Sequence, residues 1–390
     1  MPNARARRRE KSAPADRLEY VDAVTGSAYA RAGVRGQGDA LAAVARHLEP
    51  TLAYPQDTEV IAGFGAFAAV LRLSSDLALA ICTDGVGSKT VVATQLNLYN
   101  TIAIDCVAMN VNDLLCVGAR PLALVDYLSV HTLDPDRDDA LLAGFGAAAK
   151  EAGIAIPGGE TAQLPSVIGS GGGHEGDGDP HAFDLVGTAI GTVAPDRLIL
   201  GRDVAPGDAV IGVASSGIHS NGLTLARRAL LELGGFSLHD RPAPLGRPLG
   251  EELLEPTTIY VRGILDLWDR GIPTRGLVHV TGDGLTNVCR LEAPVGYRLH
   301  TLPDPPPIFD LIRSTGDLDD AEMYTVFNMG VGFAVVTEPA MASAAITSLE
   351  SSGYRAQTIG EVTEEAGVVV IEEPGLRGGL RGGEGFFTPA

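Results

Sequence analysis

The sequence is poor in lysine, aromatic residues and cysteine. Among its 390 residues, lysine occurs only at positions 11, 89 and 150, and aromatic residues make up 5 %. The four cysteines form no CxxC pair and no Cys/His spacing typical of a zinc site. They are Cys82, Cys106, Cys116 and Cys289. We therefore expect buried free thiols, as in a reducing cytosol, and no disulfide framework.

Long apolar runs and positive charge are also scarce. No stretch approaches the roughly 18 uncharged apolar residues that a transmembrane helix needs, so no membrane partner is expected. The net charge of −20 argues against a nucleic acid as a standing partner, whereas a phosphate ligand needs only local positive charge. The Arg-rich start lacks the apolar core of a secretory signal. These features together predict a cytoplasmic protein.

Length and composition favour an α/β enzyme of two domains. Hydrophobic residues reach 45 % and glycine is abundant at 49 residues, which is typical of a globular chain rather than a disordered one. We expect a disordered tail over residues 1–20 and a first domain over 21–194. A second domain should follow over 195–372, with a loose Gly-rich tail over 373–390.

The most informative stretch runs from Ile81 to Lys89. An apolar segment predicts a buried strand that stops at Asp84, turns through two glycines and presents Lys89. A carboxylate at a strand end suits a divalent cation, since Mg²⁺ prefers hard oxygen ligands. Glycine backbone and a lysine charge suit phosphate. The spacing is not that of a Walker A motif, and an ordinary strand–turn–helix is the alternative.

Residues 101–117 predict a buried helix that carries unusual polar side chains. Apolar residues recur nearly all round this helix, yet it contains Asp105, Asn112 and Asp113. Burying two carboxylates without partners would be very costly. They must either pair locally or meet a cation and a ligand.

A third acid follows a short predicted strand in Gly158-Gly159-Glu160-Thr161. Asp84, Asp113 and Glu160 therefore stand in similar chain settings, which favours one shared cation site. The Gly/Asp-rich segment from Gly169 to Pro180, next to His181, is expected to be a surface loop; a His-based metal site is the alternative.

Two further segments suit an anionic ligand. Gly63-Phe64-Gly65 forms a short loop that covers a nucleotide or simply turns the chain. In the second domain, a predicted strand runs into Ser216-Gly217-Ile218-His219-Ser220-Asn221-Gly222, which opens a helix over 223–233. Small polar residues at a helix N-terminus bind anions, although Ser220 and Asn221 could simply cap the helix. His219 is a candidate phosphate donor or general acid/base.

In this order, the motifs resemble those of the aminoimidazole ribonucleotide synthetases, or phosphoribosylformylglycinamidine cyclo-ligases. The resemblance covers roughly residues 22–365. Its carriers are Tyr29-Ala30-Arg31-Ala32-Gly33-Val34, Gly63-Phe64-Gly65, Thr83-Asp84-Gly85-Val86-Gly87-Ser88-Lys89, Asp105 to Asp113, Gly118-Ala119-Arg120-Pro121-Leu122, Gly158-Gly159-Glu160-Thr161-Ala162, Ser215 to Gly222, Glu322-Met323-Tyr324 and Phe327-Asn328-Met329-Gly330.

The resemblance implies a two-domain α/β subunit whose N-terminal domains pair in a homodimer and form a shared β-barrel. It implies ATP-dependent ring closure of formylglycinamidine ribonucleotide to aminoimidazole ribonucleotide in purine biosynthesis, with ADP and phosphate released. ATP and Mg²⁺ are the implied cofactors. Asp84, Asp113 and Glu160 would hold Mg²⁺, with Asp105 behind them. Lys89, the Gly63–Gly65 loop and the Ser216–Gly222 turn would bind phosphates, with Asn112 and Thr161 nearby.

One departure from the family pattern concerns Gly282-Asp283-Gly284, where the family commonly has three glycines. This resembles the thiamin monophosphate kinase pattern, so either an extra carboxylate joins the metal site or the substrate differs. A small-molecule kinase on the same fold is therefore the rival hypothesis. A non-catalytic nucleotide-binding subunit is a third, which the intact Asp84, Lys89 and Glu160 disfavour.

Overall fold

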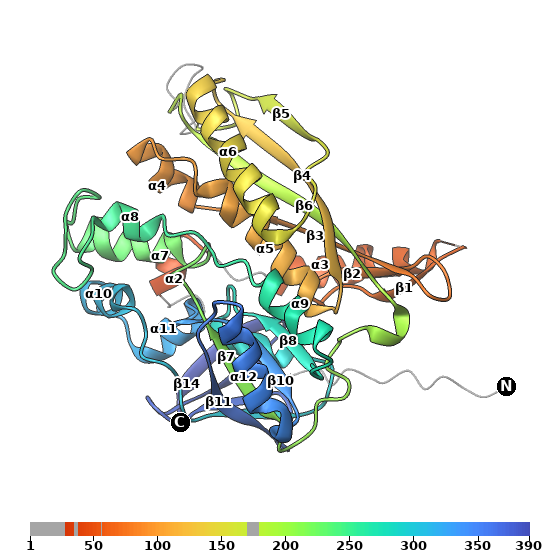
Figure 1. Ribbon diagram of the computed structural model, residues 1–390. Helices are drawn as coiled ribbons and strands as arrows, with labels where there is room; N and C mark the ends of the chain where they lie inside the picture. Colours follow the sequence, from red (N-terminus) through yellow and green to blue (C-terminus); the bar gives the residue numbers. More distant parts are fainter. Residues whose placement is uncertain (1–27, 35–37, 56, 170–178) are drawn as a thin grey trace.

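Each half of the chain builds one β-sheet with helices packed beside it (Figure 1). The computed structural model describes residues 28–34, 38–55, 57–169 and 179–390. The predicted tail over residues 1–20 and most of the predicted Gly/Asp-rich loop lie outside the described residues. The strands of the first sheet end at Val193, and those of the second begin at Ala209.

The first sheet has six strands in the order β1-β2-β3-β6-β4-β5. They are β1 (Glu59–Ala62), β2 (Ala69–Arg72), β3 (Ala78–Gly85), β4 (Arg120–Val130), β5 (Gly159–Gln163) and β6 (Phe183–Val193). All neighbours pair antiparallel except β4 and β5, which are parallel. Every second residue of β6 is buried, as expected for a strand with one face in a core.

Helices cover one face of this sheet. They are α4 (Lys89–Leu96), α5 (Ile102–Cys116) and α6 (Pro135–Ala152), preceded in the chain by α2 (Ala28–Arg31), α3 (Gly38–His47) and the 3₁₀ turn η1 (Glu49–Ala53). The side chain of Asp134 caps α6 by accepting from the Asp136 and Arg137 amides, and Gly153 ends the helix at φ +67°. Helix α5 packs on the sheet and also contacts β8 and α9 of the second half. It thereby joins the two halves.

The opposite face of the first sheet is open within the described chain. Leu122, Val125 and Tyr127 of β4 are 46 %, 43 % and 42 % exposed. Their neighbours on β6 that point the same way are only partly buried. A β-sheet face with large apolar side chains this exposed is unusual for a finished surface.

The second sheet has eight strands in the order β14-β13-β12-β9-β11-β7-β10-β8. They are β7 (Ala209–Ala214), β8 (Gly276–His279), β9 (Gly296–Leu299), β10 (Val331–Thr337), β11 (Ala356–Thr363), β12 (Val368–Ile371), β13 (Leu376–Arg381) and β14 (Glu384–Pro389). Strand β10 is buried along its whole length because β7 and β8 flank it and helices pack nearby.

The second half also contains most of the short helices. They are η2 (Pro195–Arg197), α7 (Leu223–Arg227), the π-helical η3 (Arg228–Leu233), α8 (Leu249–Leu253), α9 (Val261–Asp269), η4 (Gly284–Arg290), α10 (Pro307–Gly316), α11 (Asp320–Val326), η5 (Pro339–Met341) and α12 (Ala342–Ser351). The helix predicted over 223–233 is therefore an α-helical turn that widens into a π-helix. No helix of the described ranges is long and apolar enough to cross a membrane.

The prediction of a loose tail over residues 373–390 is wrong. Residues 376–389 form the antiparallel hairpin β13–β14, which adds two strands to the edge of the second sheet. Leu376 and Phe387 are buried, and the Phe387 amide donates to Thr325 Oγ1 of α11. Glycines at 378, 379, 382, 383 and 385 hide the alternating pattern that identifies strands in a sequence.

The expectation of buried free thiols is confirmed for three cysteines. Cys82, Cys106 and Cys116 are free and buried, and Cys289 is free and half-buried. Cys106 and Cys116 of α5 lie within the main core, and the Cys116 sulfur accepts from the His279 amide of β8 at 3.1 Å.

Candidate functional site

Strand β3 carries Asp84 to the junction of the two halves. The Asp84 carboxylate accepts a hydrogen bond from the Gly85 amide at 2.7 Å. Asn110 Nδ2 of α5 donates to the Asp84 carbonyl at 3.1 Å and fixes the backbone there. The chain then turns through Gly87 at φ +71° into α4, so this turn requires a residue that tolerates the left-handed region.

Asp84 lies beside a second carboxylate. Burial, and after it the negative charge of Asp113, raises the pKa of Asp84 to about 6. The Gly85 amide and His279 act in the opposite direction. Two carboxylates that repel each other in a partly buried place are a setting in which a divalent cation is favourable.

His279 fixes the Asp113 carboxylate by a direct contact. Its Nδ1 lies 2.8 Å from Asp113 Oδ1, and the imidazole is fully buried at the end of β8. The Cys82 thiol donates to the other Asp113 oxygen at 3.7 Å. His279 was not predicted from the sequence. The available signal was a histidine within the otherwise apolar segment Leu277 to Val280.

Lys89 and Asp105 form a buried ion pair with each other. Lys89 Nζ lies 2.9 Å and 2.8 Å from the two Asp105 oxygens, and both side chains are 0 % exposed. The ammonium also donates to the Glu255 carbonyl at 2.5 Å. Asp105 Oδ1 accepts further from Thr257, through its amide at 2.8 Å and its hydroxyl at 2.6 Å, and from Ser220 Oγ at 3.1 Å.

These contacts resolve the two alternatives for the helix carboxylates. Asp105 is engaged by Lys89, Ser220 and Thr257, which are distant in the chain, so protein groups supply the partners that its charge needs. This arrangement does not support the predicted role of Asp105 behind the other metal-binding acids. Asn112 is also engaged across the junction, donating to the Thr258 carbonyl at 2.9 Å and accepting from the Tyr260 amide at 3.0 Å. Of the two carboxylates of this helix, Asp113 is the one that lies beside Asp84.

The Ser216–Gly222 turn faces the glycine turn of the first half. Ser88 Oγ lies 2.9 Å from Thr224 Oγ1, just after Gly222, which links the two turns directly. Asn328 Nδ2 donates to the Gly217 and Ile218 carbonyls at 2.9 Å and 3.0 Å. This contact fixes the shape of the turn.

The buried side chain of His219 stabilises the same turn. It is 2 % exposed with φ +65°, and its Nε2 accepts from the Ser216 amide at 3.2 Å. Burial, followed by the charges of His279 and Lys89, holds the pKa of His219 well below its usual range. A neutral imidazole in this place supports the loop. To act as an acid or base on a ligand it would need the turn to open.

Glu160 does not lie beside Asp84 and Asp113. Across the sheet, Asp84 pairs with Gly187, Gly187 with Asp126, and Asp126 with Gly159. Glu160 and Thr161 follow on β5, and Glu160 stands one position away from this row, opposite Tyr127 on the exposed face. Within the described ranges, no group of three Asp, Glu, His or Cys side chains could hold a metal ion.

The Gly63–Gly65 loop lies over the second half. Phe64 is 52 % exposed, whereas Arg290 of η4 donates to the Gly65 and Ala66 carbonyls at 3.4 Å and 3.1 Å and stacks 4.0 Å from the centre of the Phe67 ring. The loop and Asp283 both line a cavity of about 650 Å³.

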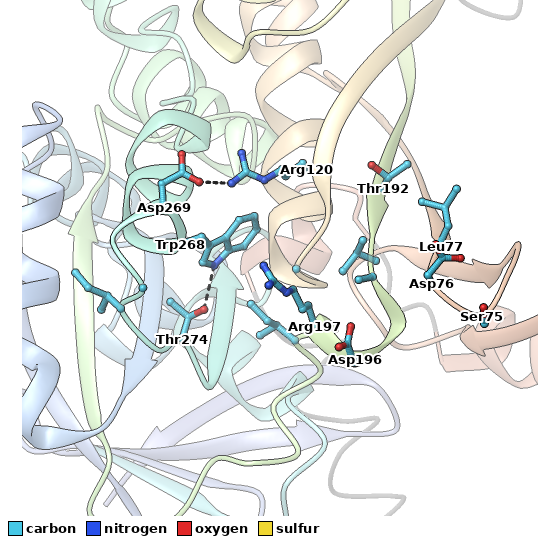
Figure 2. Close-up of a pocket in the computed structure, with 16 residues that line it drawn as sticks. Ser75, Asp76, Leu77, Arg120, Thr192, Asp196, Arg197, Trp268, Asp269 and Thr274 are labelled. Atoms are coloured by element: carbon cyan, nitrogen blue, oxygen red, sulfur yellow. Dashed lines mark hydrogen bonds and ion pairs between the residues drawn. The ribbon is translucent and has the colours of Figure 1, made fainter.

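A larger cavity of about 1020 Å³ lies elsewhere between the halves (Figure 2). Arg120 pairs with Asp269 on one wall, and Trp268 donates to Thr274 at 3.1 Å below them. None of the predicted site residues lines this cavity. Size alone therefore does not identify the site.

Comparison with known protein families gives two matches that cover most of the chain. Residues 65–193 match the AIR synthase related protein, N-terminal domain, and residues 205–373 match the AIR synthase related protein, C-terminal domain. Among solved structures, Thermotoga maritima PurL complexed with ATP superposes with a TM-score of 0.52 at 19 % identity, over 80 % of this chain and 44 % of that one. The thiamine-monophosphate kinase of Stenotrophomonas maltophilia gives 0.54 at 21 %, over 86 % and 95 %. At these identities the structures show the fold alone.

Curated sequence relatives are much more similar. The phosphoribosylformylglycinamidine cyclo-ligase of Methanothermobacter thermautotrophicus is 48 % identical over 83 % of this chain and 90 % of its own length. That of Carboxydothermus hydrogenoformans is 43 % identical over 85 % and 95 %. The resemblance inferred from the motifs is confirmed: the chain belongs to the AIR synthase related family, in the group of the phosphoribosylformylglycinamidine cyclo-ligases.

Proposed function

We propose that this protein closes the imidazole ring of aminoimidazole ribonucleotide, using ATP and formylglycinamidine ribonucleotide and releasing ADP and phosphate. The observation that carries the proposal is the sequence identity of 43–48 % to cyclo-ligases along nearly their whole length. The paired acids Asp84 and Asp113, at the junction of the two halves, support it.

The chemistry requires activation of an amide oxygen, which is a very poor leaving group. Transfer of the γ-phosphoryl group of ATP to that oxygen gives an iminophosphate. The neighbouring amidine nitrogen attacks the same carbon, its C–N bond forms, and the C–O bond breaks to release phosphate. The protein's task is to hold the two reacting groups together and to balance the phosphate charge.

The residues present fit a magnesium ion. Asp84 and Asp113 offer carboxylate oxygens, and Asp84 carries an unfavourable negative charge that a cation would relieve. Bound there, Mg²⁺ would neutralise phosphate oxygens. In our proposal His279 keeps Asp113 pointed at Asp84, and Asn110 fixes the backbone of Asp84.

We propose that Glu160 contributes from the partner subunit of a homodimer. It lies at an exposed position of β5, on the face that also presents Val125 and Tyr127, whereas Thr161 points to the opposite face. Pairing two such faces would bury the apolar surface and form a closed barrel without open sheet faces. It would also bring Glu160 of one subunit toward the site of the other.

Lys89 and His219 take supporting roles in the conformation described. Lys89 is held by Asp105 and Glu255, and His219 holds the Ser216–Gly222 turn. We propose that this turn and the Gly63–Gly65 loop bind phosphates through backbone amides, the turn being supported by these buried groups.

Product analysis tests the function against its rival. With Mg-ATP and formylglycinamidine ribonucleotide, we expect free phosphate and an aminoimidazole product in equal amounts, detected by mass spectrometry. A small-molecule kinase would instead leave the phosphoryl group on a stable acceptor. Turnover of thiamin monophosphate, or ATP binding without any imidazole product, would contradict the proposal.

A further inference from the structure

The turn Gly282-Asp283-Gly284 places a charged side chain between two glycines. Asp283 adopts φ +70°, in the left-handed region that glycine enters without cost and aspartate enters at a small one. The Asp283 side chain makes a contact that glycine at this position could not make.

That contact is with the C-terminal hairpin. The Asp283 side chain packs directly against Gly385 of β14. A Cβ at Gly385 would lie 2.1 Å from Thr286 Oγ1 and 2.6 Å from Asp283 Cβ, so only glycine allows the hairpin to approach this closely. Asp283 and Gly385 therefore fit each other as a pair.

The hairpin rests on the elements that follow the turn. Strand β14 contacts α11 and η4, and Phe387 is buried there with its amide bonded to Thr325. The C-terminal domain of the family matches only as far as residue 373, before the hairpin begins at Leu376. The hairpin is thus an addition to the part of the chain that matches the family.

The turn and the phosphate loop are connected through η4. Asp283 precedes the first residue of η4, and Arg290 is its last residue. Arg290 holds the carbonyls of Gly65 and Ala66 and stacks on Phe67. Leu380 and Gly383 of the hairpin line the same 650 Å³ cavity as Phe64 and Asp283.

We propose that Asp283 is a positioning residue that ties the C-terminal hairpin to η4 and thereby sets the place of the Gly63–Phe67 loop over the bound nucleotide. This inference rests on the proposed function for the identity of the nucleotide. The alternative, that Asp283 is a metal ligand, fits less well, because no group of three Asp, Glu, His or Cys side chains among the described residues could hold a metal ion.

The two roles predict different behaviour for two substitutions. Asp283→Asn keeps a side chain of the same size against Gly385 but is a poor metal ligand, whereas Asp283→Gly removes the side chain altogether. A positioning role predicts a KM for Mg-ATP near that of the wild type in the asparagine variant. In the glycine variant we expect KM to rise about 5- to 20-fold with kcat nearly unchanged, because a loop contact acts on bound nucleotide before and during the reaction.

Gly385→Ala gives an independent approach from the other side of the contact. It should displace the hairpin and raise KM as Asp283→Gly does. Pro389→Ala, at an exposed hairpin position, is the control and should leave KM unchanged. Thermal unfolding of each variant confirms that it is folded before its kinetics are compared.

Binding of Mg-ADP, measured by calorimetry, separates this inference from the proposed function. If the wild type does not cyclise formylglycinamidine ribonucleotide, the proposed function fails, but the order of affinities (wild type and Asp283→Asn tight, Asp283→Gly and Gly385→Ala weak) still tests the positioning role. Equal loss in the asparagine and glycine variants, reversed by excess Mg²⁺, would overturn the inference in favour of a metal ligand. Wild-type affinity in both Asp283→Gly and Gly385→Ala would also overturn it.

Discussion

At the scale of single residues, Asp84 is a group whose charge the fold makes unfavourable. Its pKa is raised from the usual 3.8 to about 6, so the folded protein holds a proton there more tightly than the unfolded chain does. Below about pH 4 Asp84 therefore costs the folded protein no stability, and the loss in the free energy of unfolding grows as the pH rises through 6.

We therefore predict that Asp84→Asn is more stable than the wild type at pH 7.5 in the absence of divalent cations, by about 2 kcal/mol. The difference should vanish near pH 4, and Mg²⁺ with a nucleotide should stabilise only the wild type. Urea unfolding at several pH values measures this. A variant less stable than the wild type at pH 7.5 would show that Asp84 is not strained by its surroundings.

The Lys89–Asp105 pair leads to the opposite prediction. Both charges are buried, so Lys89→Met leaves Asp105 without its cation, and we expect a loss of about 3–5 kcal/mol in the free energy of unfolding. The exposed pair Arg202–Glu292 is the matched control, and Glu292→Gln should cost less than about 1 kcal/mol. Similar losses in the two variants would contradict the assignment of Lys89 to the interior.

These residues also show how far the sequence could predict the site. The chain setting of Asp84 and Asp113 was enough to predict that they meet, because a strand end and a buried helix carry them to one junction. That Thr257 pairs with Asp105 could not be predicted, since Thr257 is distant in the chain and has no motif. His279 was missed for the same reason.

At the scale of elements, the C-terminal hairpin is the clearest difference from expectation. Its five glycines lack the side chains from which strand alternation is read, and its stability comes from docking of a few residues on α11 and η4. The alternation of side chains between the two faces of a strand explains the second difference, which is the place of Glu160. Glu160 is one residue out of register with the row of Asp84, and sequence does not reveal register.

We predict that Phe387→Ala lowers the free energy of unfolding by about 3 kcal/mol, because it empties a buried aromatic site. Phe386→Ala, at the adjacent half-buried position, should cost about 1 kcal/mol or less. Chemical denaturation compares the two. Equal and small effects would indicate that the hairpin does not dock.

At the scale of the whole molecule, the main feature to explain is the open face of the first sheet. Large apolar side chains on a central strand of a sheet require a partner, and a second copy of this chain offers the same face. The dimer in our account both covers this surface and completes the site with Glu160.

Charge placed on that face should dissociate the dimer. We predict that Val125→Arg with Tyr127→Arg converts a homodimer to monomers and abolishes turnover, as measured by light scattering after gel filtration and by phosphate release. Leu142→Arg, at a 67 % exposed position of α6 on the covered side of the sheet, is the control and should remain dimeric and active. A wild-type monomer with full activity would contradict this part of the account.

The central claim is that Asp84 serves an ATP-dependent ring closure at the junction of the two halves. The most direct measurement is the rate of aminoimidazole ribonucleotide formation by wild type and Asp84→Asn, beside Asp184→Asn, an exposed acid of β6. We predict turnover in the wild type and the control, with a loss of at least about 100-fold in Asp84→Asn. Equal rates in all three proteins, or no imidazole product from the wild type, would contradict the account.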